Sequence, residues 1–143
     1  MDLGTFGAVM KFSTEVLDRS AALYRTFSSL TKEPTLTSAI ESLLKETEKN
    51  RSLIEQVRRE NVTEMILEPV SGFSDTDFSV EIKLGESADS RELLAALLAI
   101  ETGQKDFFAA VSAKFPFPEV TRVFRKICQK KELALATLRS LRI

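Results

Sequence analysis

Apolar residues recur along four separate segments of the chain at intervals of three and four residues, the period of an α-helix that buries one face. The last segment shows the pattern most clearly, because intervals of four and three alternate without a break. Its stripe consists of Val120, Phe124, Ile127, Lys131, Ala134, Leu138 and Leu141. A lysine therefore stands in the middle of an apolar stripe, where a buried charge needs a partner.

The three earlier segments have the same period, and charged residues interrupt two of them. The third stripe consists of Leu94, Leu98, Glu101, Phe108 and Phe115, so a glutamate stands within it. The second includes Ile40, Leu44, Ile54 and Val57, and its middle turns hold Glu48 and Arg51. The first has a wider apolar face, formed by Val9, Met10, Phe12, Val16, Leu17, Ala21, Leu23, Tyr24, Phe27 and Leu30.

These segments predict four antiparallel helices, at roughly residues 5–30, 36–60, 88–114 and 118–141. Ser38 with Glu41, and Asp89 with Glu92, have the spacing of capping boxes, which marks the starts of the second and third helices.

The connections between these helices are of two kinds. Two are short and join antiparallel neighbours, whereas residues 61–87 form a long connection that must cross the bundle. Within it, residues 78–84 alternate between apolar and polar, which predicts an extended strip along the helices. The fold expected is an all-α four-helix bundle with a crossover between the second and third helices, as one domain of residues 1–143.

Composition narrows the classes of function. The chain has 143 residues, 43% of them hydrophobic and 29% charged, which is typical of a soluble globular domain. Its net charge of -1 gives no field that would attract nucleic acid or a membrane surface. The first residues fit neither a signal peptide nor a membrane span, so we expect a cytoplasmic protein. The single cysteine, Cys128, is expected to be a small buried hydrophobe, with a reactive thiol as the alternative.

The order of short, long and short connections, together with "ETGQKDFF" at residues 101–108, resembles the ferritin-like superfamily and its rubrerythrin-like branch. In that family the first and third helices each offer a glutamate about seven residues before an aromatic residue. The second and fourth helices each carry Glu-x-x-His. The resemblance implies a di-iron site in the middle of the bundle, with six protein ligands.

At the positions that match those ligands, this chain has lost most of the metal chemistry. The six positions hold Leu17, Glu48, Arg51, Glu101, Lys131 and Ala134. Only the two glutamates match, and the sequence contains no histidine. Arg51 and Lys131 would place positive charge where the metal ions should sit, so electrostatics opposes metal binding. The resemblance therefore implies a degenerate site without a metal or other cofactor.

The remaining charged residues are balanced in number. Glu48 and Glu101 carry two negative charges, and Arg51 and Lys131 carry two positive ones. We predict that all four point toward one level of the interior and form a buried ion network in place of the metal. The alternative is that helix rotation puts some of them on the surface, where most lysines and glutamates lie.

The resulting hypothesis is a non-catalytic bundle that acts through protein association, as a homodimer or with an unidentified protein partner. Two alternatives remain open. The first is a divergent metal-dependent oxidase or peroxide-reducing enzyme that uses Asp18, Glu48, Glu101 and Glu132. The second is a pocket for a small apolar ligand between the helices. Its lining would be Phe107, Phe108, Phe115, Phe117 and Phe124.

Overall fold

The structure is a computed structural model that describes residues 6–65, 88–114 and 117–142, with the side chains of residues 61–65 excepted. These residues form four helices and no strand. The helices are α1 (Phe6–Leu30), α2 (Pro34–Met65), α3 (Ser90–Lys114) and α4 (Pro118–Ser140). The all-helical class and the four helices predicted from the periodicity are thereby confirmed.

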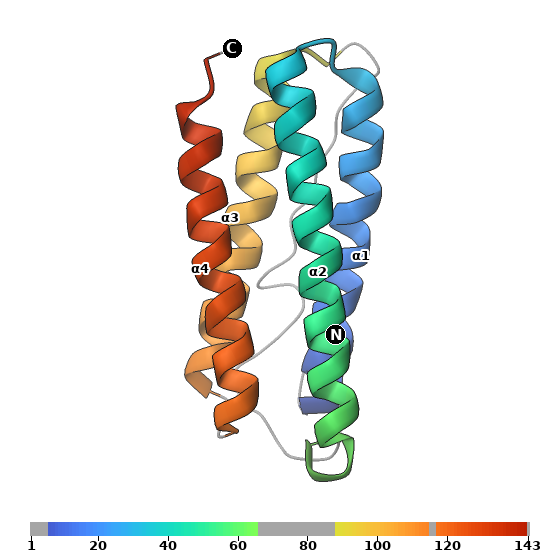
Figure 1. The fold of residues 1–143 in the computed structure, drawn as a ribbon, viewed down its shortest axis with the longest axis vertical. Coiled ribbons are helices and arrows are strands. Elements are labelled where there is room, and N and C mark those ends of the chain that lie inside the picture. The colour runs from blue at the N-terminus through green and yellow to red at the C-terminus, as the bar shows by residue number, and fades with distance from the viewer. Residues whose placement is uncertain (1–5, 66–87, 115–116, 143) are drawn as a thin grey trace.

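The four helices lie side by side along one long axis (Figure 1). α1 packs on α2 and α3 packs on α4, while weaker contacts join α2 to α4 and α1 to α3. Asp18 pairs with Arg51, and Arg25 pairs with Glu48, so the residue numbers rise on α1 as they fall on α2. These two helices therefore run in opposite directions, and Figure 1 shows the same relation between α3 and α4.

The helix ends follow local chemistry. The Asp89 side chain accepts a hydrogen bond from the backbone N–H of Glu92 at 2.9 Å, so the predicted cap of α3 is present. α2 instead begins at Pro34, a residue suited to the first turn because it lacks an N–H, and not near Ser38. It continues to Met65, so residues 61–65 are helical, and the prediction that they belong to the crossover is wrong. The apolar strip at 78–84 lies outside the described residues.

The apolar core falls into two clusters. One contains Phe6, Val9, Met10, Phe12, Leu17, Ile54, Val57, Phe107, Phe108, Val111, Val120, Phe124 and Ile127. The other contains Tyr24, Phe27, Leu36, Ile40, Leu43, Leu93, Ala96, Leu97, Ile100 and Leu138. On each helix, the residues between these two groups include buried polar side chains: Ser20, Thr47, Asn50, Glu101, Gln104 and Lys131. A polar layer therefore separates two apolar layers.

The rotation of two helices differs slightly from the predicted stripes. On α3, Leu93 and Leu97 are fully buried, whereas the expected Leu94 and Leu98 are half-buried. On α4, Leu135 takes the buried place expected for Ala134, which is half-buried. Each shift is one residue, because a helix covered by two neighbours buries a face wider than a single stripe.

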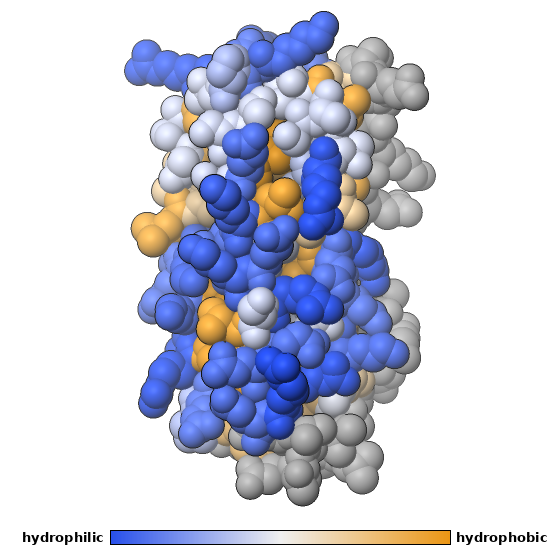
Figure 2. Space-filling view, turned by 45° about the vertical axis from the view of Figure 1, so that its right-hand side comes forward, coloured by the Kyte–Doolittle hydropathy of each residue, from blue (hydrophilic) through white to orange (hydrophobic). Residues whose placement is uncertain are grey.

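The face of the molecule drawn in Figure 2 is mainly hydrophilic. Figure 2 turns the side of α1 toward the viewer and shows apolar residues only in small areas between polar ones. The additional apolar residues of α1, Val16, Leu23 and Leu30, are half-buried and pack against the two core clusters. Within the described helices, none is sufficiently long and apolar to cross a membrane.

Candidate functional site in the buried polar layer

A chain of three polar side chains crosses the middle of the bundle. Lys131 Nζ on α4 lies 2.6 Å from Glu101 Oε2 on α3, and both residues are 2% exposed. The Tyr24 hydroxyl on α1 donates a hydrogen bond of 2.9 Å to Glu101 Oε1. The carboxylate thus receives one donor at each oxygen, from two different helices. The sequence prediction that Glu101 and Lys131 are buried and paired holds in this structure.

Pairing is what makes this burial possible. Moving one charged group from water into a protein interior has a penalty of several kcal/mol, which attraction offsets only when the partner is close and hydrogen-bonded. The short Lys131–Glu101 distance is that of a charge-assisted hydrogen bond. Because Glu101 interacts with α1 and α4 as well as belonging to α3, the group fixes the register of three helices.

Tyr24 is completely buried, and this changes its acidity. Burial is the main reason that the pKa of Tyr24 lies well above its ordinary value, and the negative charge of Glu101 and the hydrogen bond to it raise it further. The hydroxyl therefore remains protonated as the donor to Glu101 at every physiological pH.

Two amide side chains in the same layer have polar atoms without a hydrogen-bond partner among the described residues. Both polar atoms of the Asn50 amide, and Oε1 of Gln104, are buried without a hydrogen-bond partner among the described residues. Thr47, one turn from Asn50, is satisfied by its own helix, because its hydroxyl donates to the Leu43 carbonyl oxygen at 2.7 Å. An unsatisfied buried amide destabilises the folded chain.

We expect Asn50→Leu to raise the free energy of unfolding by about 1–3 kcal/mol, since leucine restores an apolar residue to the buried face of α2 and removes an unpaired amide. Urea unfolding monitored by circular dichroism measures the change in this free energy. Ser52→Leu, at an exposed position of the same helix, is the matched control and should change stability by less than about 0.5 kcal/mol. A loss of stability in Asn50→Leu would show that the amide is hydrogen-bonded in solution.

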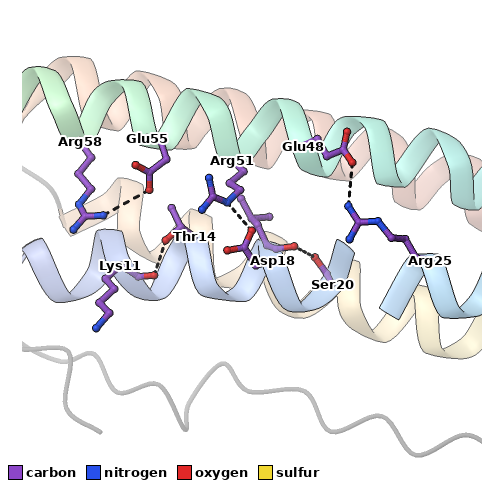
Figure 3. Close-up of polar contacts among 10 residues, drawn as sticks. Lys11, Thr14, Asp18, Ser20, Arg25, Glu48, Arg51, Glu55 and Arg58 are labelled. Atoms are coloured by element: carbon purple, nitrogen blue, oxygen red, sulfur yellow. Dashed lines mark hydrogen bonds and ion pairs between the residues drawn. The ribbon is translucent and has the colours of Figure 1, made fainter. Parts of the chain in front are cut away.

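Glu48 and Arg51 lie outside this layer, so the prediction of one buried network of four charges is wrong for these two residues. Their side chains are 57% and 44% exposed. Figure 3 shows that Glu48 pairs with Arg25 and Arg51 pairs with Asp18, both across the outer side of the α1–α2 contact. The buried face of α2 at this level is instead formed by Thr47 and Asn50.

Of the six positions implied by the ferritin-like resemblance, Glu101 and Lys131 are in contact, whereas Glu48 and Arg51 lie on the surface. Leu17 is buried within an apolar cluster, and Ala134 is half-buried at the edge of the other. The alternative set of four carboxylates is not assembled either, because Asp18, Glu48 and Glu132 are exposed whereas Glu101 is buried. Within the part of the chain that the structure describes, no three His, Cys, Asp or Glu side chains are grouped as metal ligands.

The remaining candidates have structural roles. Phe107 contacts Phe12 and Phe108, and Phe108 contacts Phe124, so the rings proposed to line a ligand pocket pack on one another. Phe117 packs on Phe6 at the end of the bundle, and Phe115 lies outside the described residues.

Cys128 is half-buried against α3, where its Sγ lies 3.8 Å from the Lys105 carbonyl oxygen. Burial is the main cause that raises the pKa of its thiol, and Glu132 adds to this effect. A thiol that ionises less readily is a weaker nucleophile at neutral pH, in keeping with a small hydrophobe and not a reactive group.

Sequence reasoning missed the roles of Tyr24, Asn50 and Gln104. Asn50 does carry a signal, since it lies at alternating intervals of three and four from Leu43, Thr47, Ile54 and Val57. Gln104 follows Glu101 by three residues, on the same side of α3. No comparable pattern identifies Tyr24, because an aromatic residue in an apolar face is ordinary core.

Comparison of the chain with known protein-family models, curated proteins and solved structures found no match.

Proposed function

We propose that this protein is a non-catalytic, ferritin-like four-helix bundle that acts through protein association. The observation that carries the proposal is the Lys131 ammonium group, which lies 2.6 Å from the Glu101 carboxylate at a position where the family resemblance implies a metal ligand. The site is thus organised around an internal cation supplied by the chain itself.

The charges in the buried polar layer support a site that binds no metal ion. A di-metal centre needs several carboxylates to balance the charge of two cations. Here the described buried residues provide one carboxylate, and Lys131 already neutralises it. A metal ion would have to displace the ammonium group and leave it unpaired in the interior, which is costly.

The arrangement of the helices supports the ferritin-like part of the proposal. Neighbouring helices run in opposite directions, and the end of α2 and the start of α3 lie at opposite ends of the molecule (Figure 1). This is the order of connections in ferritin-like bundles. Residues of three helices converge on Glu101 at the middle of the bundle, the level at which such folds build their sites.

Elemental analysis of protein purified from the cytoplasm without chelator tests the proposal. We expect iron, manganese and zinc well below one ion per chain, and no change in thermal unfolding on addition of a chelator. Light scattering of the same sample determines the oligomeric state, and therefore whether the proposed association includes a homodimer. Two metal ions per chain, with oxygen or peroxide consumption that disappears in Glu101→Gln, would establish the alternative enzymatic function.

A further inference from the structure

A shallow groove follows the contact between α2 and α4 on the outside of the bundle. One half has a volume of about 750 Å³ and is mainly apolar; its lining includes Ala39, Leu43, Leu133, Ala134, Leu138 and Leu141. The other half has a volume of about 530 Å³ and is lined mainly by polar residues. Lys130 belongs to both halves, so they form one continuous surface, which we call the α2–α4 groove.

Lysines dominate the polar half of the α2–α4 groove. Lys45 and Lys49 come from α2, and Lys126 and Lys130 come from α4, so each helix contributes a pair spaced by four residues. Like charges at this spacing on one helix repel each other. Of these four lysines, Lys130 is the one that has an ion pair among the described residues, to Glu46 at 3.2 Å.

Apart from Glu46, the carboxylates near these lysines are directed elsewhere. Glu48 borders the groove but is directed to Arg25 on α1, as Figure 3 shows. Glu132 follows Lys130 by two residues, about 200° around the helix, so this carboxylate lies on the opposite side of α4 from the groove. The surface therefore combines an apolar strip with a cluster of four lysines, three of which have no ion pair among the described residues.

The shape of the α2–α4 groove suits a helix. Its lining extends from Lys126 on α4 to Leu141, the residue that follows this helix, which corresponds to roughly 20–25 Å along the axis. Leu133, at its edge, is 71% exposed and is the only large hydrophobic residue that is exposed in the described part of the chain. A long groove between two helices with an apolar strip is the geometry that receives the apolar face of an amphipathic helix.

We infer that the α2–α4 groove binds an acidic amphipathic helix of a partner protein, and this inference rests on the proposed function in protein association. The apolar residues of the partner helix would cover Leu133 and the apolar half, and its carboxylates would lie on the four lysines. A second copy of α4 fits poorly, because that helix has six basic and two acidic residues and would bring positive charge against the groove.

A synthetic peptide provides the test. The probe is a fluorescein-labelled helix of about 18 residues, about 27 Å long, with leucines at helical spacing in one half and glutamates in the other. Fluorescence anisotropy at an ionic strength of about 0.15 M should show saturable binding, which weakens as salt is added. A peptide with lysines in place of the glutamates should not bind.

Variants of the full chain locate the binding surface. Lys126→Glu combined with Lys130→Glu, and separately Leu133→Asp, should each weaken binding at least about tenfold. Arg122→Glu combined with Arg125→Glu is the matched control, since it reverses two exposed charges of α4 outside the groove lining. This control should bind within about twofold of wild type. Circular dichroism of each variant establishes that the helices are intact.

The inference would be overturned by no saturable binding of the glutamate peptide, by equal binding of the lysine peptide, or by equal loss in the control variant. Lysine-dependent binding to anionic vesicles in place of the peptide would overturn it too. A homodimer that dissociates in the Lys126 and Lys130 variant would also overturn it, because the occupant would then be a second copy. In that case the proposed function in association would stand. The presence of a catalytic di-metal centre would remove the proposed function itself.

Discussion

Lys131→Met is expected to lower the free energy of unfolding by about 3–5 kcal/mol, the cost of removing one partner from a buried ion pair. Without the ammonium group, the Glu101 carboxylate remains 2% exposed in the core with the Tyr24 hydroxyl as its one remaining side-chain donor. The size of Met is similar to that of Lys, so the loss reports the stranded charge and not a cavity.

Replacing Lys131, Glu101 and Tyr24 together should restore most of the lost stability. In the double variant Lys131→Met with Glu101→Leu, no buried charge remains, but the Tyr24 hydroxyl loses its acceptor. Adding Tyr24→Phe removes the hydroxyl that was left without an acceptor, and replacement of a buried ion pair and its donor by apolar residues is often neutral or stabilising. The triple variant should therefore be more stable than Lys131→Met alone by at least about 2 kcal/mol.

Denaturant unfolding of the wild type and these variants measures both effects. Arg51→Met is the matched control, because it removes the cation of an ion pair whose two side chains are 44% and 54% exposed. It should change stability by less than about 1 kcal/mol, as exposed pairs do. Equal effects of Lys131→Met and Arg51→Met, or additive losses across the double and triple variants, would contradict a buried and coupled pair.

The second large effect is expected from Tyr24→Phe, which should lower the free energy of unfolding at neutral pH by about 1.5–3 kcal/mol, the range for a hydrogen bond to a charged group. The difference between wild type and variant should depend on pH. The pKa of Tyr24 is raised in the folded state, so its stabilising contribution is complete below about pH 10, the pKa of an exposed tyrosine. Above that pH the unfolded chain releases the proton first, and the contribution falls until the folded pKa is passed.

The phenol can be observed directly, because the sequence contains one tyrosine and no tryptophan. An absorbance titration of the folded protein should place the formation of the tyrosinate well above pH 10, or make it coincide with alkaline unfolding. The same titration in concentrated denaturant should give a midpoint at about 10. A normal midpoint in the folded protein, or a Tyr24→Phe difference that stays constant up to alkaline unfolding, would exclude a buried hydroxyl on Glu101.

The sequence by itself determined the number of helices and most of their bounds, since periodicity and helix ends are local properties of the chain. It also predicted that Glu101 and Lys131 are buried together. Each stands within a stripe whose other members are apolar, so each is carried into the core by its neighbours. Opposite charges carried to one level of a bundle lower the cost of burial only by pairing.

Only the tertiary structure decided which charges of α2 lie outside. Successive residues of a helix differ by about 100°, so a small error in rotation moves a side chain from the core to the surface. Thr47 and Asn50 continue the intervals of three and four from Leu43 to Ile54. Glu48 and Arg51 do the same from Leu44, so both sets fit the helical period. Packing on α1 and α4 put the smaller, uncharged residues inside, because the Glu101–Lys131 pair is already neutral and a further buried charge would have no partner.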